Sequence, residues 1–115
     1  MKFSESLKSY RDFRYVYDHG KSYANRLLVM YVVENNQQIN RLGISVSKKV
    51  GNSVVRHHIT RLLRESYRLH ESIFNSGLDI VVVARKNAAS SSYREIENAL
   101  LHLGKLHKIT NHSIL

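Results

Sequence analysis

The sequence predicts a single domain of mixed helices and strands, an α+β or α/β sandwich built around one mixed sheet. Three observations support this prediction. The chain has 115 residues, enough for one core of modest size. Helical patterns occur near both ends and in the middle, with strand patterns between them. No linker, repeat or low-complexity block divides the chain, and proline is absent.

The first half predicts a helix followed by strands. Residues 9–18 carry apolar side chains at helical spacing, after a serine suited to the N-cap and before Gly20, which suits a stop. Residues 26–34 are rich in β-branched and aromatic side chains and predict a strand, and residues 21–25 are a candidate for a shorter one. Residues 41–49 alternate between apolar and small polar side chains, which predicts a half-buried strand. We expect the two long strands to form a hairpin across the polar turn between them.

The second half predicts a helix, a central strand and a last helix. The middle helix is expected over residues 53–72, capped by Asn52 or by the serine after it. Residues 78–85 form a nearly continuous apolar run, typical of a strand buried on both faces. Ser92 and Glu95 form a capping box for the last helix.

The middle helix has two distinct faces when successive residues are turned by about 100°. One stripe is apolar and is expected to pack on the sheet: Val55, Ile59, Leu62, Leu69 and Ile73. The row almost opposite is cationic and is expected to point into solvent: His57, Arg61, Arg64 and Arg68. Lys48 and Lys49 come just before the helix, and Glu65 is its only acid before Glu71.

This distribution of charge predicts a polyanionic partner. The chain has 18 lysines and arginines against 9 acids, a net charge of +9. An ordinary solvated helix face mixes acids and bases, whereas arginines three and four residues apart repel one another. Binding to a nucleic acid releases counterions and offsets that repulsion. An anionic membrane surface is the weaker alternative, because no separate basic amphipathic tail is visible.

Several other classes of protein are disfavoured. The absence of cysteine excludes disulfides and fits a reducing compartment. No apolar run approaches the ~20 residues of a membrane helix, and the N-terminus shows no signal-peptide pattern, so we expect a cytoplasmic protein with no membrane partner. His57 and His58 have no carboxylate or cysteine at ligand spacing, so no metal site is predicted. The acids are scattered along the chain, which argues against a protein nuclease and predicts no catalytic residues.

The segment "RLGISVSKKVGNSVVRHHITRLLRE", with "SYANR" before it and "DIVVVAR" after it, resembles the protein subunit of bacterial ribonuclease P. The match runs from about Leu7 to His107. The resemblance implies one RNA-binding domain over residues 1–115 with the order α-β-β-β-α-β-α, a mixed sheet and a left-handed βαβ crossover through the charged helix. Residues 108–115 are expected to form a frayed tail.

In this family a large RNA is the catalyst and uses Mg²⁺ to remove the 5′ leader of precursor tRNA. The resemblance therefore implies the catalytic RNA and precursor tRNA as partners, no DNA, and no cofactor held by dedicated protein ligands. The residues expected to bind the catalytic RNA are Lys48, Lys49, Arg56, His57, His58, Arg61, Arg64 and Arg68. The sequence departs from the family's docking motif at three positions. His57 stands where the family usually has asparagine, His58 where it has arginine or lysine, and Thr60 where it has lysine.

The resemblance also places a leader-binding cleft between the first helix and the sheet. Its aromatic positions correspond to Phe13, Tyr17 and Tyr31, with the small Ser45 and Ser47 beside them. Phe13 and Tyr17, four residues apart on a helix, could form a stacking platform for a single strand. Phe13 could equally be a core residue. Composition alone also allows a generic structural RNA-binding protein of ribosomal type.

Overall fold

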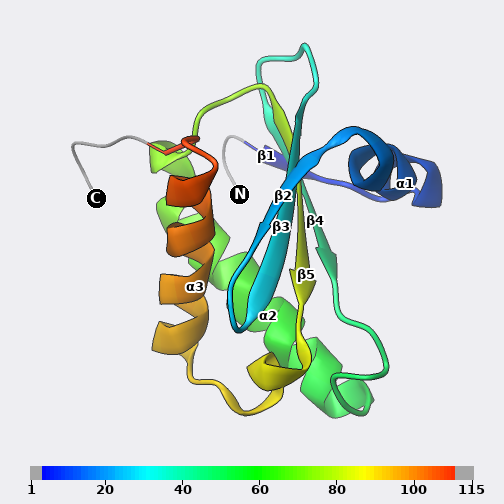
Figure 1. Cartoon of the computed structure of the whole chain (residues 1–115), viewed down its shortest axis with the longest axis vertical. Coiled ribbons are helices and arrows are strands. Elements are labelled where there is room, and N and C mark those ends of the chain that lie inside the picture. Colours follow the sequence, from blue (N-terminus) through cyan, green and yellow to red (C-terminus); the bar gives the residue numbers. More distant parts are fainter. Residues whose placement is uncertain (1–3, 111–115) are drawn as a thin grey trace.

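The computed structural model describes residues 4–110, which form a five-stranded mixed sheet with helices on both faces (Figure 1). The strands are β1 (Ser4–Ser6), β2 (Lys21–Ala24), β3 (Leu28–Glu34), β4 (Asn40–Ser45) and β5 (Leu78–Ala84). The helices are α1 (Tyr10–His19), α2 (Ser53–His70) and α3 (Tyr93–Leu106). Helices α2 and α3 cover one face of the sheet and α1 lies on the other. The predicted α+β fold class with a single domain and a mixed sheet is confirmed.

Strand β5 lies at the centre of the sheet, as its apolar run predicts. Ile80 and Val82 belong to the large core under α2 and α3, whereas Val81 packs with Val16 of α1 on the opposite face. All three β5 side chains are at most 1% exposed. A strand apolar on both faces is stable only where helices cover both faces, and this places β5 in the middle of the sheet.

The predicted hairpin between the two long strands is wrong. The sheet order is β1-β4-β5-β3-β2, so β5 lies between β3 and β4, antiparallel to β3 and parallel to β4. The buried Asn40 helps to fix this arrangement, because its side chain accepts a hydrogen bond from the Leu78 amide at 2.9 Å and donates one to the Asn75 carbonyl at 2.6 Å. The hairpin of the fold is instead β2–β3, which confirms the short candidate strand. Strands β4 and β5, joined through α2, form the βαβ crossover.

Strand β1 was not predicted. It spans only three polar residues, which have no alternating pattern, and it pairs in parallel with β4 at the edge of the sheet. The Leu7 amide extends the pairing with a hydrogen bond to the Leu42 carbonyl at 2.9 Å. The hydroxyl groups of Ser4 and Tyr67 hydrogen-bond at 2.8 Å, so β1 is held by partners distant in sequence.

Helix α2 starts as predicted, and four of the five residues predicted for its apolar stripe pack in the core: Val55, Ile59, Leu62 and Ile73. The Asn52 side chain accepts a hydrogen bond from the Val55 amide at 3.0 Å. The helix ends at His70 and is followed by a 3₁₀ turn at Glu71–Ile73. Leu69, expected in the core, is 52% exposed, whereas Leu63 and Tyr67 are buried. Tyr67 is among the largest fully buried side chains, and its hydroxyl group hydrogen-bonds to the side chains of Ser4 and Asn40.

Helix α3 begins with the predicted capping box, in which Ser92 and Glu95 each bond to the other's backbone amide. Beyond the helix, Ile109 and Thr110 are buried, and Thr110 forms a β-bridge with Phe74. Within the tail predicted over residues 108–115, Lys108 is exposed but Ile109 and Thr110 are packed, and residues 111–115 lie outside the described part. Within residues 4–110, no helix is long and apolar enough to cross a membrane.

Candidate nucleic-acid interface

Helix α1 packs against the sheet face opposite α2 and α3. It covers one end of that face and leaves the other end uncovered. Its N-cap Ser9 accepts the Asp12 amide at 3.1 Å, and Val16, fully buried, fixes the helix against Val81. Figure 1 shows α1 at the upper end of this sheet face. The connection between β4 and α2 lies beside the lower end of the same face. The side of α1 that faces this open area carries the aromatic residues singled out from the sequence.

Three aromatic rings form a continuous cluster at this place. The ring centres of Phe13 and Tyr17 lie 6.4 Å apart, and those of Tyr17 and Tyr31 lie 5.0 Å apart in an edge-to-face arrangement. Phe13 rests on the backbone of Gly43, where a Cβ atom would lie 2.7 Å from two of its ring carbons. Phe13 is thus half-buried and supports the cluster, while Tyr17 is 38% exposed and offers its ring to a ligand.

A groove of about 550 Å³ runs along this cluster, lined by Lys8, Tyr10, Phe13, Arg14, Tyr17, Asp18 and Ser45. Three residues predicted for the leader cleft are in this lining, and Tyr31 reaches the groove through its contact with Tyr17. Ser47 is exposed beyond the end of β4 and is not part of the lining. Sequence reasoning missed Lys8, Tyr10 and Arg14. The signal that could have found Tyr10 is its spacing of three and seven residues from Phe13 and Tyr17.

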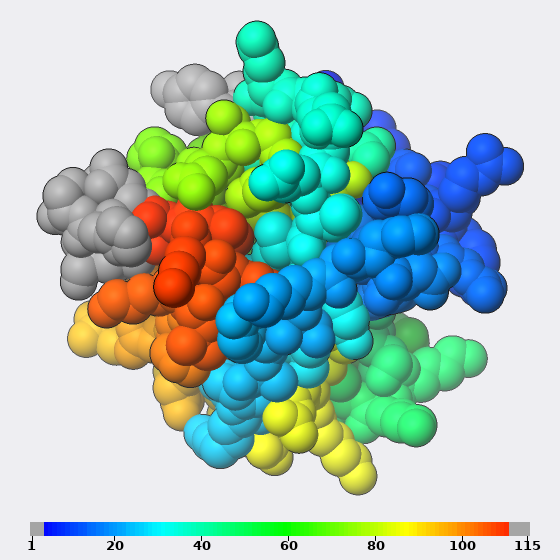
Figure 2. All heavy atoms as spheres, turned by 45° about the horizontal axis from the view of Figure 1, so that its top comes forward, coloured from blue at the N-terminus to red at the C-terminus, as the bar shows by residue number. Residues whose placement is uncertain are grey.

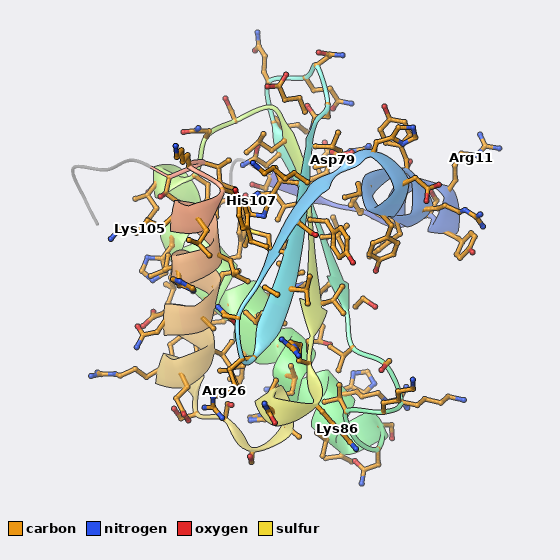
Figure 3. The ribbon with its side chains drawn as sticks, viewed as in Figure 1. Arg11, Arg26, Asp79, Lys86, Lys105 and His107 are labelled. Atoms are coloured by element: carbon orange, nitrogen blue, oxygen red, sulfur yellow. The ribbon has the colours of Figure 1, made fainter. Side chains whose placement is uncertain are left out.

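An ion pair between the partly exposed Arg41 and the buried Asp79 lies next to the groove and ties α1 to the sheet. The guanidinium of Arg41 donates to both carboxylate oxygens of Asp79, at 2.9 and 2.6 Å, and lies 3.4 Å from Asp12 of α1. Asn35 donates a further hydrogen bond to Asp79 at 2.9 Å. The bonds to Asp79 raise the pKa of Arg41. Figure 3 shows Asp79 at the end of β5 that α1 crosses, so this network helps to fix the position of the helix over the sheet.

The cationic row of α2 is exposed as predicted. His57, Arg61, Arg64 and Arg68 all point into solvent. A depression of about 400 Å³ on this helix is lined by His58, Arg61, Leu62, Arg64 and Glu65. Among the ion pairs of the described residues, none involves Arg61 or Arg64. These two guanidinium groups are therefore available to an external anion.

The other members of the predicted docking set differ in how free their charges are. Arg68 donates to both carboxylate oxygens of Glu65, at 3.0 and 2.5 Å, and this bond lowers the pKa of the Glu65 carboxyl. The charge of Arg68 is thus partly neutralised within the helix. Arg56 is half-buried, and its Nε atom is enclosed without a hydrogen-bond partner in the described part of the chain. Lys48 and Lys49 are exposed in the connection between β4 and α2.

His57 and His58 are both exposed on the cationic face of α2. The double variant His57→Asn, His58→Arg adds one permanent positive charge to this face and is expected to bind RNA more tightly. Measuring the dissociation constant of both proteins checks this, and an unchanged affinity would make both histidines spectators.

Comparison with known proteins shows where this arrangement recurs. The family model for ribonuclease P matches residues 1–108. The chain belongs to the ribonuclease P protein family. The ribonuclease P protein component of Lachnoclostridium phytofermentans is 66% identical over 110 residues, covering 96% of this chain and 95% of that protein. The corresponding component of Alkaliphilus metalliredigens is 54% identical over 103 residues, covering 90% and 93%.

Solved structures of ribonuclease P proteins have the same fold. The Staphylococcus aureus RNase P protein superposes with a TM-score of 0.86 at 41% identity, covering 92% of this chain and 97% of that one. The Thermotoga maritima RNase P protein gives a TM-score of 0.81 at 31% identity, covering 88% and 96%. The ribonuclease P family resemblance identified in the sequence is therefore confirmed.

Proposed function

We propose that the chain is the protein subunit of a ribonuclease P ribonucleoprotein that removes the 5′ leader of precursor tRNA. The α2 row binds the catalytic RNA, and the groove beside α1 holds the single-stranded leader. The hydrolysis is assigned to the RNA and its Mg²⁺. Residues 4–110 contain no group of three histidine or carboxylate side chains arranged to hold a metal.

The observation that carries this proposal is the separation of two surfaces with different chemistry. The groove offers aromatic rings beside cations, the combination that binds unpaired nucleotides. The α2 row offers Arg61 and Arg64, which form no ion pair within residues 4–110 and suit the phosphates of a structured RNA. Figure 2 shows α1 in blue and the green residues at the start of α2 on the same side of the molecule, so one leader could pass from the docked RNA into the groove. A generic RNA-binding protein needs only the second surface.

Tyr17→Ala tests the leader groove. In a holoenzyme reconstituted with the catalytic RNA, this change should weaken the binding of precursor tRNA by roughly 1–3 kcal/mol, the usual loss for one base–aromatic stack. Binding of mature tRNA, which has no leader, should stay unchanged. The dissociation constants of both substrates are measured for the unchanged and variant holoenzymes.

Two controls accompany this measurement. Tyr17→Phe keeps the ring and should bind precursor tRNA nearly as well as the unchanged protein. The protein alone should cleave nothing, and it should lower the Mg²⁺ concentration at which the catalytic RNA cleaves precursor tRNA. Equal losses for precursor and mature tRNA would remove Tyr17 from the leader path, and no effect on RNA cleavage would favour the generic RNA-binding protein.

A further inference from the structure

We propose that the leader path extends beyond Phe13 to an outer stacking position at Tyr10, where one more unpaired base is held and Lys8 and Arg14 contact the adjoining phosphates. This inference rests on the proposed function, because it extends the path of the same single strand. It adds a binding position that the aromatic cluster of Phe13, Tyr17 and Tyr31 does not include.

The side chain of Tyr10 is exposed in the groove and open to a ligand. It is the first residue of α1, it is 77% exposed, and it lines the same groove as Phe13 and Tyr17. Its ring takes part in none of the aromatic contacts found among residues 4–110. Figure 3 shows the neighbouring Arg11 at the outer end of α1, pointing away from the sheet. Tyr17 contacts Tyr31 of β3, and Tyr10 lies two helical turns away at the start of α1, so a strand that lies on the sheet near Tyr31 reaches Tyr10 last.

The spacing along α1 makes Tyr10 a separate position from Tyr17. The two residues are two helical turns apart, about 10 Å at 1.5 Å per residue. Phe13 occupies the turn between them, so a base stacked on Tyr10 lies on the far side of Phe13 from one stacked on Tyr17. Phe13 is half-buried over Gly43 and gives the groove an apolar floor.

The cations around Tyr10 suit phosphates. The Nη1 atom of Arg14 lies 3.5 Å from the Tyr10 hydroxyl, and Lys8 is exposed on the same groove. The one acid in the lining is Asp18, whose carboxylate lies 3.7 Å from the Nε atom of Arg14. Both side chains of this pair are more than half exposed, so the pair is weak and a phosphate can displace the carboxylate. The lining then keeps a net positive charge.

A leader-length series tests the outer position. Precursor tRNAs with leaders of increasing length are titrated against reconstituted holoenzymes carrying Tyr10→Ala, Tyr17→Ala or Tyr15→Ala. Tyr15 is the matched control, because it is also an exposed tyrosine of α1 but stacks on His19 outside the groove. We expect Tyr10→Ala to weaken the binding of precursor tRNA about 5- to 150-fold, the equivalent of one lost base stack. This loss should occur only for leaders that are longer than the shortest leader whose binding is weakened by Tyr17→Ala. Tyr10→Phe and Tyr15→Ala should bind as the unchanged protein does.

Three results would overturn the outer position. If Tyr17→Ala weakens binding but Tyr10→Ala equals Tyr15→Ala at every length, the path ends at Phe13 and the proposed leader groove stands without the extension. If Tyr10→Ala acts at leaders too short to respond to Tyr17→Ala, the order of the positions is reversed. If neither variant distinguishes precursor from mature tRNA, the leader groove itself fails and the extension with it. Thermal unfolding of each variant verifies that the exposed substitutions leave the fold intact.

Discussion

Replacing Asp79 with alanine is expected to destabilise the fold by about 1–3 kcal/mol, because the guanidinium of Arg41, 25% exposed, is left without its main hydrogen-bond partner. The side chain of Asp79 is 4% exposed and accepts two hydrogen bonds from Arg41 and one from Asn35. Without the carboxylate, the guanidinium of Arg41 stays near the sheet with only the partial compensation of Asp12 at 3.4 Å. The free energy of unfolding, measured by denaturant titration, checks this.

Asp12→Ala is the matched control on the same network. Its carboxylate is 34% exposed and makes only the longer contact with Arg41, so we expect a loss of about 0–1 kcal/mol. The contrast separates the value of the pair formed by Arg41 and Asp79 from a general effect of removing an acid from a basic protein. A loss below about 1 kcal/mol for Asp79→Ala would mean that Arg41 is solvated from outside and that α1 is held by apolar packing alone.

The double variant Arg61→Ala, Arg64→Ala is expected to reduce the salt dependence of binding to the catalytic RNA by up to about two units of slope. Each exposed arginine that contacts a phosphate releases about one counterion. A slope lower by two units means that the gain in affinity on going from 1 M to 0.1 M salt is about 100-fold smaller for the variant than for the unchanged protein. Both side chains are in solvent and outside the core, so the fold should be unaffected. Affinity is measured over a series of salt concentrations.

Arg68→Ala is the control on the same helix face. Because Arg68 is already bonded to Glu65, its removal should change the slope by less than one unit. An unchanged slope for the double variant, with unchanged affinity, would place the docking surface elsewhere on the protein. A larger change for Arg68→Ala than for the double variant would show that the RNA displaces Glu65 and uses Arg68 instead.

The features determined by the sequence itself are those that depend on neighbouring residues. The capping box at Ser92, the cap at Asn52 and the alternation predicted over residues 41–49 are local patterns, and the structure has each of them, although β4 already ends at Ser45. The exposure of Arg61 and Arg64 also follows from their helical spacing relative to the apolar residues of α2. The ribonuclease P family could be identified from the segment around these residues because its motifs are contiguous.

Other features were decided only by the tertiary structure. The insertion of β5 between β3 and β4 depends on pairing between strands distant in the sequence and on the buried Asn40, neither of which leaves a local pattern. The burial of Tyr67 in place of Leu69 depends on its hydroxyl bonds to Ser4 and Asn40 from other elements. The groove depends on the same kind of contact, because Tyr10 and Ser45 line one surface only once α1 is fixed on the sheet. Periodicity specifies which side chains share a face, whereas long-range packing and buried hydrogen bonds specify which faces meet.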